Sequence, residues 1–338
     1  MRTTIVDVAK RAGVSVATVS RVVNGNYPVK EETRERVEAA VQALDYVPNL
    51  QARELNTRKS STIGVVVPSF DNMFFAEVLN GIESALREDA FSLLLACAQN
   101  DSILEERCVR DLIARNVSGV IVVSPNTATI ASRFYESATR RVPLVFINSY
   151  EHVRGISYVS SDERGGAKMA LEHLFSYGHR RVLFVRGEKS DSYRIKEEVY
   201  REFMSVQHLF YEEDIINVGP GNSLETVENT MYQLMDMMMN MQATAIFCCN
   251  DLMAAGAVNA CQRMGRRVPH DVSVVGYDNI PLSRLITPKL TTIDQKMTEL
   301  GEAAARLMMA KIAHESPQDT VLQNALVERE TTGYRVEA

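Results

Sequence analysis

Residues 4–44 carry the hydrophobic spacing of three short helices. The apolar positions of the first helix recur at helical intervals and stop at Gly13, which tolerates the positive φ of a helix end. Ser15 is placed to cap the second helix with its hydroxyl group, and the third helix spans residues 30–44. The apolar faces consist of Ile5, Val8, Ala9, Ala12, Val16, Val19, Val22, Val23, Val37, Ala40, Val41 and Leu44. This pattern predicts a small helical bundle with a thin core.

From residue 63 onward, short apolar runs alternate with longer helical stretches. The runs are Ile63–Val67, Phe91–Cys97, Gly119–Val123, Leu144–Ile147, Val182–Val185, Ala245–Cys249 and Val272–Gly276. Continuous apolar strands separated by helices are typical of parallel sheets that are buried on both faces. So many strands favour two doubly wound α/β lobes over one large sheet, with a ligand cleft between the lobes.

A short polar region separates these two patterns. Asn49 can cap a helix that runs to Asn56, and a polar tract follows at residues 57–62. Such a helix is marginal alone, because isolated helices below ~12 residues are unstable in water. We therefore expect three parts: a helical headpiece at residues 1–48, a hinge helix and linker at 49–62, and a two-lobed body at 63–338.

Charge divides the chain near the same boundary. The net charge of the 338 residues is −6, but residues 1–59 carry ten Lys and Arg against seven Asp and Glu. A basic head on an acidic body suggests a polyanion partner, although a difference of this size also arises by chance. The N-terminus lacks the apolar core of a signal peptide, and no apolar run reaches the ~18 residues that cross a bilayer. We expect a cytoplasmic protein without a membrane partner.

Motifs of catalysis and metal binding are not found in the sequence. It has no GxSxG, HExxH or Walker A motif and no clustered acid–base pair. Its five cysteines include no CxxC pair, which disfavours a disulfide framework and a zinc site. We therefore expect no enzyme activity, no cofactor and no metal.

Residues 7–24 have the order helix, glycine turn, helix, with small polar groups and one arginine on the second helix. Such a unit fits the major groove of DNA. With Thr33–Val37 and Tyr46–Asn49, it resembles the headpiece of the LacI/GalR family of bacterial transcription regulators. The resemblance continues through Ile63–Pro68, Gly178–His179, Cys249–Gly256, Val274–Asn279 and Pro288–Ile293.

The resemblance implies a helix-turn-helix headpiece followed by two lobes of the periplasmic-binding-protein type. It implies a homodimeric repressor of a carbohydrate catabolic operon that binds pseudo-palindromic double-stranded operator DNA. A sugar or sugar derivative would bind between the lobes as the effector. The body alone would also support a free sugar-binding protein of the periplasmic type, and an α/β enzyme acting on sugars is a third class.

Several headpiece residues are candidates for DNA contact. Arg21 can donate two hydrogen bonds to a guanine edge or can contact a phosphate. Val16 and Ala17 can meet thymine methyl groups, and the resemblance assigns operator choice largely to them. Short hydroxyl and amide groups suit phosphates and base edges, and they occur at Thr4, Thr18, Ser20, Asn24 and Thr33. The alternative is that these residues are exposed helix caps and surface positions.

For the hinge helix, the resemblance implies pairing of two copies in the minor groove, beginning at Asn49. Leu55 would wedge into the central base step, Ala52 would permit close approach and Arg53 would contact the backbone. An ordinary linker contact is the alternative for Leu55.

Candidate effector-binding residues follow the predicted strands, where doubly wound sheets place their ligands. They are Ser69, Asn72, Phe74, Phe75, Asn148, Asn250, Asp251 and Asp278. Amides and carboxylates beside an aromatic wall suit a hydroxyl-rich molecule such as a sugar. The alternatives are a helix cap for Asp251 and a core position for Phe75.

A basic residue is also expected in the effector site. Arg194, with Ser190 and Lys189 nearby, matches by resemblance the position at which an arginine reaches the effector. The cationic pair could also accept a carboxylate or phosphate. Val199-Tyr200 replaces the Gly-Phe pair that is usual in the family, so the alignment around Ser190 and the nature of the effector are less well determined.

Overall fold

The computed structural model describes residues 3–24, 28–47, 60–188, 190–238 and 243–335. Contacts divide the chain into two compact units, Met1–Ser60 and Ser61–Ala338, and each is described by itself. The predicted hinge residues Asn49, Ala52, Arg53 and Leu55 lie outside the described residues, and so does Lys189.

The first unit is a bundle of α1 (Ile5–Ala12), α2 (Val16–Asn24) and α3 (Glu31–Ala43). The prediction for the turn is confirmed, because Gly13 follows α1 with a φ of 65°. The Ser15 cap is also confirmed, since its hydroxyl accepts a hydrogen bond from the Thr18 backbone at 3.2 Å. The helices meet on Val8, Val19 and Val37, which are fully buried. The unit is a helix-turn-helix with a third supporting helix.

The second unit has two lobes, each built on a six-stranded sheet. The N-lobe sheet has the strand order β11-β5-β4-β3-β1-β2, and the C-lobe sheet has the order β12-β10-β9-β8-β6-β7. Among these strands only β10 and β12 pair antiparallel; the other pairs are parallel. The N-lobe strands are β1 (Thr62–Val67), β2 (Ser92–Cys97), β3 (Gly119–Val123), β4 (Leu144–Ile147), β5 (Ser157–Ser161) and β11 (Thr320–Leu322). The C-lobe strands are β6 (Val182–Arg186), β7 (Ile215–Asn217), β8 (Ala245–Cys248), β9 (Ser273–Asp278), β10 (Thr291–Asp294) and β12 (Ala325–Val327).

Helices pack against both sheets, so the central strands are buried on both faces. The N-lobe helices are α5 (Met73–Glu88), α6 (Ser102–Ala114), α7 (Thr127–Ala131), α8 (Phe134–Ala138) and α14 (Met297–Ile312). The C-lobe helices are α9 (Glu163–Ser176), α10 (Asp191–Val206), α11 (Glu225–Met238), α12 (Asp251–Arg263) and α13 (Leu282–Leu285), with a 3₁₀ turn at Glu212–Asp214. The doubly wound α/β fold predicted for each lobe is confirmed.

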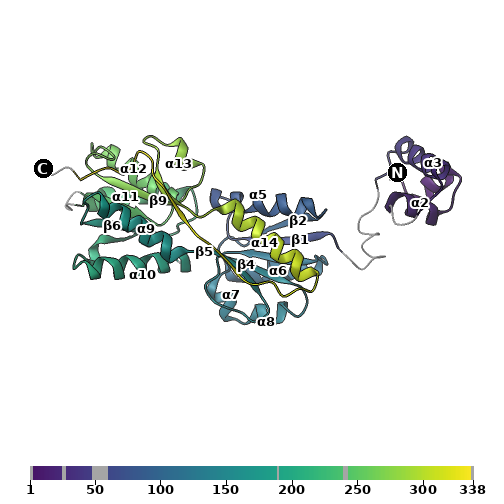
Figure 1. The fold of residues 1–338 in the computed structure, drawn as a ribbon, viewed down its shortest axis with the longest axis horizontal. Coiled ribbons are helices and arrows are strands. Elements are labelled where there is room, and N and C mark those ends of the chain that lie inside the picture. The colour runs from purple at the N-terminus through teal and green to yellow at the C-terminus, as the bar shows by residue number, and fades with distance from the viewer. Residues whose placement is uncertain (1–2, 25–27, 48–59, 189, 239–242, 336–338) are drawn as a thin grey trace. The chain divides into compact units, whose positions relative to one another are not determined.

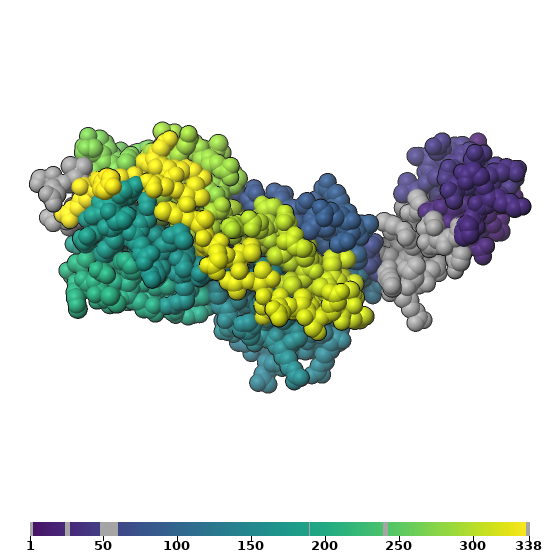
Figure 2. Space-filling model, viewed as in Figure 1, coloured from purple at the N-terminus to yellow at the C-terminus, as the bar shows by residue number. Residues whose placement is uncertain are grey.

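Within the described residues, the chain passes between the lobes three times: from β5 to α9, from β10 to α14, and from β11 to β12. Figure 2 shows the last of these segments, in yellow, running along both lobes. Because the chain crosses between the lobes three times, three of its segments pass beside the cleft between the two sheets.

The seven predicted strands are all present, and their observed ends differ from the predicted ends by at most two residues. The additional strands β5, β7, β10, β11 and β12 were not predicted. They are short, and several carry Ser, Thr or Asp in place of a continuous apolar run, which removes the hydrophobic signal. No helix in the described parts of the chain has the length and apolar character needed to span a membrane.

Candidate functional site

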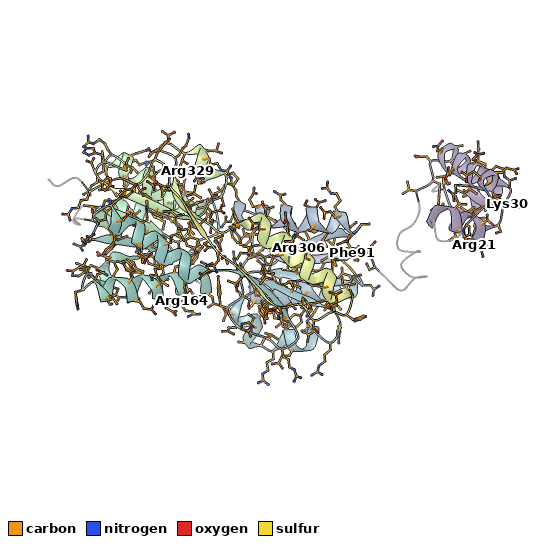
Figure 3. The ribbon with its side chains drawn as sticks, viewed as in Figure 1. Arg21, Lys30, Phe91, Arg164, Arg306 and Arg329 are labelled. Atoms are coloured by element: carbon orange, nitrogen blue, oxygen red, sulfur yellow. The ribbon has the colours of Figure 1, made fainter. Side chains whose placement is uncertain are left out.

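The outer face of α2 carries the predicted DNA-reading residues Val16, Ala17 and Arg21, all of which are exposed. Figure 3 labels Arg21 on this helix. Val16 is 41% exposed, so it belongs to this face and not to the apolar face on which its spacing also placed it. Val19 lies on the opposite side of the helix and anchors it in the bundle. The bundle therefore exposes a face of α2 that carries two small apolar side chains and one arginine.

The hydroxyl groups predicted to contact DNA take up different positions. Thr4 is exposed, and its hydroxyl and backbone N–H both donate to Asp7 at 2.7 and 2.9 Å, which caps α1 and lowers the pKa of Asp7. The Thr18 and Ser15 hydroxyls lie 2.9 Å apart in the α2 cap. For Thr4 and Thr18, the helix-cap alternative therefore describes the contacts that the structure shows. Ser20 and Thr33 are half-buried on α2 and α3, and Asn24 is the last residue of α2.

In the second unit, a cavity of about 60 Å³ lies between the lobes. Most of the predicted effector residues line it: Asn72, Phe74, Phe75, Asn148, Ser190, Asn250 and Asp278. Sequence reasoning missed the other lining residues, which are Ser124, Glu163, Ser192, Tyr193, Lys196, Asn222, Cys249 and Gln295. The cavity is thus walled mainly by amides, hydroxyls and charged groups from both lobes.

Two of the predicted residues lie beside the cavity and do not line it. Ser69 is buried, and its hydroxyl accepts a hydrogen bond from the Asp71 backbone at 3.0 Å. Asp251 is fully buried and accepts hydrogen bonds from the Thr292 hydroxyl at 2.5 Å and the Ile280 backbone at 2.8 Å. Burial raises the pKa of Asp251 to about 7. Asp251 ties the start of α12 to β10 and to the loop after β9.

Arg194 also lies away from the inner cavity. Its side chain is 56% exposed, and it pairs with Asp191 at 3.3 Å and Glu198 at 2.6 Å along the outside of α10. The basic residue that reaches the cavity is Lys196. Residues two apart on a helix point in nearly opposite directions, so Arg194 and Lys196 cannot both face inward. Arg194, the predicted effector cation, therefore lines an outer part of the cleft, and Lys196 is the basic residue of the inner cavity.

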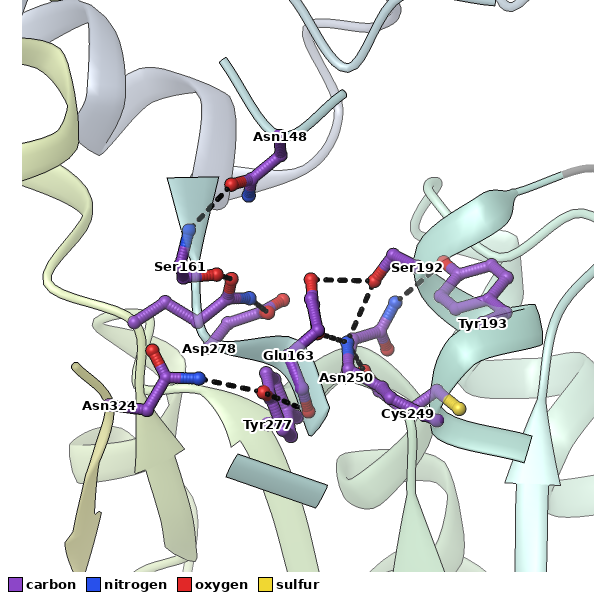
Figure 4. Close-up of polar contacts among 12 residues, drawn as sticks. Asn148, Ser161, Glu163, Ser192, Tyr193, Cys249, Asn250, Tyr277, Asp278 and Asn324 are labelled. Carbon is purple, nitrogen blue, oxygen red and sulfur yellow. Dashed lines mark hydrogen bonds and ion pairs between the residues drawn. The ribbon is translucent and has the colours of Figure 1, made fainter. Parts of the chain in front are cut away.

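Lys196 is the centre of a buried polar cluster on the cavity wall, and Figure 4 shows the residues around it. Its side chain is 1% exposed, and its Nζ lies 3.1 Å from the Oε2 of Glu163. The ammonium group also donates to the Ser192 hydroxyl at 2.9 Å and the Cys249 carbonyl at 3.1 Å. It lies 3.7 Å from the centre of the Tyr277 ring. Charge, hydrogen bonds and the aromatic face together compensate the burial of this lysine.

Asp278 connects the cavity with the crossovers. It ends β9 with a φ of 114°, and its Oδ1 accepts a hydrogen bond from the Gln295 amide at 2.5 Å. Gln295, in the second crossover, accepts from the Ser161 hydroxyl at 2.6 Å, and Ser161 ends β5 before the first crossover. Burial raises the pKa of Asp278 well above its ordinary value. A change at the cavity wall can therefore reach two crossovers through three side chains.

The third crossover joins the same network (Figure 4). The Asn324 amide donates to the Tyr277 hydroxyl at 2.8 Å and to the Asp162 carbonyl at 3.0 Å. Tyr277 in turn donates to the Glu163 carbonyl at 3.3 Å. The residues that hold the lobes together are thus bonded to the residues that line the cavity.

Several hydrogen bonds bridge the lobes directly, among them one from the Tyr150 hydroxyl to Glu163 at 2.8 Å and two at helix starts. The Asn72 amide, at the start of α5, donates to the Asn222 side chain at 3.3 Å. The Thr127 hydroxyl, at the start of α7, donates to Asp191 of α10 at 2.7 Å. Both bonds lie at helix starts facing the cleft, and they must break when the lobes separate. Among the described residues, no group of three or more His, Cys, Asp or Glu side chains is arranged to hold a metal ion.

Comparison with known proteins gives matches over almost the whole chain. Residues 4–49 match the model described as bacterial regulatory proteins, lacI family, and residues 171–332 match the periplasmic binding protein-like domain. Catabolite control protein A of Priestia megaterium is 32% identical over 328 residues, which are 96% of each chain. The ribose operon repressor of Halalkalibacterium halodurans is 33% identical over 333 residues, covering 98% of this chain and 97% of that protein.

A solved structure agrees with these sequence matches. The lac repressor dimer bound to operator and the anti-inducer ONPF superposes with a TM-score of 0.86 at 28% identity, covering 98% of this chain and 100% of the repressor chain. The helix-turn-helix, the two lobes and their order along the chain are therefore shared with a family of known architecture. The chain belongs to the lacI family of bacterial regulatory proteins.

Proposed function

We propose that this protein is a ligand-responsive, sequence-specific DNA-binding repressor of a carbohydrate catabolic operon. One observation carries the proposal: a helix-turn-helix unit and a two-lobed unit with a polar cavity occur in one chain, in the order found in proteins named as repressors. Regulation, and not catalysis, is the role that this combination supports. The protein would act in the cytoplasm, where its DNA target is accessible.

The proposed DNA contacts begin on α2. Its outer face, with Val16, Ala17 and Arg21, would enter the major groove, while hydroxyl groups of the headpiece hold the phosphates. A homodimer would read a pseudo-palindromic operator, as suggested by the similar lac repressor, which is a dimer on its operator. The hinge residues predicted from the sequence would contact the minor groove.

The proposed effector is a sugar or sugar derivative bound in the cavity. Amide and carboxyl groups line the cavity together with Phe74 and Phe75, which suits a molecule with polar edges and an apolar face. A ligand there would change the bonds that bridge the lobes and the network that reaches the crossovers. If it binds the two lobe arrangements with different affinity, it shifts the equilibrium between DNA-binding and non-binding dimers.

Selection from random DNA tests the DNA-binding role. The full-length chain is incubated with a library of random duplexes, and bound DNA is recovered over several rounds. We expect enrichment of one pseudo-palindromic sequence, with half-site centres separated by about one helical turn, ~10 base pairs. Recovery of unrelated sequences without a shared motif would contradict the proposal.

Arg21→Ala distinguishes base reading from phosphate contact. If Arg21 reads a guanine, the variant loses about 1–3 kcal/mol on the selected operator and much less on unrelated DNA. Fluorescence anisotropy with both duplexes at one salt concentration measures the two losses. Equal losses on the two duplexes would show that Arg21 contacts only the backbone.

A further inference from the structure

The buried lysine of the cavity has no hydrogen-bonding capacity left for a ligand. An ammonium group has three N–H donors. Lys196 has three acceptors within 3.1 Å: Glu163, Ser192 and the Cys249 carbonyl. The Tyr277 ring covers a further side of the ammonium group. A cation that is saturated in this way cannot also receive a ligand phosphate or carboxylate without breaking an existing contact.

The charge of the inner cavity is also unfavourable for an anion. Among its described lining residues, the acidic and basic side chains are Glu163, Asp278 and Lys196. Glu163 neutralises Lys196, so the cluster carries no net positive charge whether Asp278 is protonated or ionised. Burial raises the pKa of Asp278 well above its ordinary value, so this carboxyl group is itself in a site that disfavours negative charge.

The parts of the cleft that adjoin the cavity are also unfavourable for an anion. The two further chambers of the cleft adjoin the inner cavity and share Ser190 with it. Their described lining residues include the acids Asp101, Glu105, Asp191 and Glu197 and the bases Arg186 and Arg194. Both arginines are already paired, Arg186 with Glu197 and Arg194 with Asp191 and Glu198. The described cleft therefore presents more acidic than basic groups.

Carboxylate oxygens with remaining hydrogen-bonding capacity line the cavity. Glu163 is 3% exposed; its Oε1 accepts from the Tyr150 and Ser192 hydroxyls at 2.8 and 2.9 Å, and its Oε2 has only the ion pair with Lys196. On Asp278, the bond from Gln295 occupies only Oδ1. A carboxylate oxygen can accept two hydrogen bonds, so Glu163 Oε2 and Asp278 Oδ2 can each accept a further bond from an O–H or N–H group of a ligand.

We infer that the effector is an uncharged or amine-bearing polyhydroxy compound, and that the Glu163–Lys196 pair excludes sugar acids and sugar phosphates. This inference rests on the proposed effector role of the cavity. It differs from the expectation that a basic pair, Arg194 with Lys189, accepts a carboxylate or phosphate. The specificity-determining feature is an internal carboxylate that occupies the place an anionic ligand would take.

Matched sugar sets test the inference on the full-length protein. Calorimetry compares glucose, glucosamine, glucuronate and glucose 6-phosphate, together with the corresponding galactose set and with ribose and ribose 5-phosphate. We expect binding by an uncharged or amine-bearing member, with its anionic counterparts at least ~100-fold weaker because an anion would lose its hydration in a buried site that offers no unpaired cation. Equal or tighter binding of an anionic member, or no binding by any member, would overturn the inference.

Two substitutions on neighbouring helices assign the discrimination to the ion pair. Glu163→Gln keeps the side-chain shape, removes the negative charge and frees Lys196, so the preference against anions should fall at least ~10-fold. Glu202→Gln removes the same charge from the outer side of α10, where Glu202 pairs with Arg164 away from the cleft, and should leave the preference unchanged. An unchanged preference in Glu163→Gln contradicts the assignment.

Different results would contradict the proposed function and the inferred effector class. A protein that selects a specific operator but binds an anionic sugar best retains the proposed function and loses the inferred effector class. A protein that selects no operator loses the proposed function, whatever it binds. If Glu163→Gln does not fold, the wild-type comparison within each sugar set still decides the effector class.

Discussion

Removal of residues 1–59 is expected to abolish operator binding and to leave the two-lobed unit folded. Helix α2 and its exposed face belong to the three-helix unit Met1–Ser60. The second unit has its own hydrophobic cores around the two sheets. Specific binding typically exceeds non-specific binding by ~10³–10⁷-fold, and this advantage should disappear. Fluorescence anisotropy on the selected operator measures the loss.

The same truncated protein provides the control. Its sugar affinity by calorimetry should match that of the full-length chain, because the cavity lies wholly within Ser61–Ala338. Its circular dichroism should show the helices of both lobes. Retention of sequence-specific DNA binding after truncation would show that the headpiece is not the DNA-reading unit.

Lys196→Met is expected to destabilise the second unit by about 3–5 kcal/mol, because it leaves the Glu163 carboxylate buried without its partner. The substitution keeps a long, flexible side chain, so the change in volume is small. Urea denaturation of the two-lobed unit, followed by circular dichroism, measures the shift in the unfolding midpoint.

Two controls separate the buried charge from other effects of losing a lysine. Lys289→Met removes an exposed lysine that pairs with Glu330 at 3.7 Å, and should change the free energy of unfolding by no more than about 1 kcal/mol. Adding Glu163→Gln to Lys196→Met removes the uncompensated carboxylate and should recover much of the loss. Equal effects of Lys196→Met and Lys289→Met would mean that burial of the pair has no energetic consequence.

The fold could be predicted where sequence and burial agree. Strands such as Gly119–Val123 are apolar and fully buried, so a continuous hydrophobic run marks them. Strands β5 and β10 end beside the crossovers, and their buried Ser161 and Thr291 are hydrogen-bonded to the side chains of Gln295 and Thr332. A polar strand of this kind has no hydrophobic period, so the sequence pattern could not separate it from a loop.

The sequence predicted those cavity residues that lie at or just after the ends of strands. Asn148 and Asn250 follow strand ends within two residues, Asp278 is the last residue of β9, and all three line the cavity. Glu163 begins a helix after a crossover, and its position depends on the path of the chain between the lobes. No local pattern carries that information.

Lys196 was not predicted as the basic residue of the inner cavity for a different reason. Arg194 and Lys196 are both compatible with a helix, and choosing the inward one requires the rotational register of α10 against the lobe. One local signal was available: Val199 and Tyr200, which stand where the Gly-Phe pair was expected, are both buried on the inward side with Lys196. Counting back from that pair along one helical turn reaches Lys196.

Ligand binding in the cavity and DNA binding by the exposed face of α2 should influence each other, and reciprocal binding measurements test this directly. Operator affinity of the full-length protein is determined with and without a saturating concentration of the tightest-binding sugar, and sugar affinity with and without operator. Both affinities should change by the same factor, at least ~5-fold, because the coupling free energy between two sites is shared. Operator affinity that is unchanged by the bound sugar would contradict this expectation.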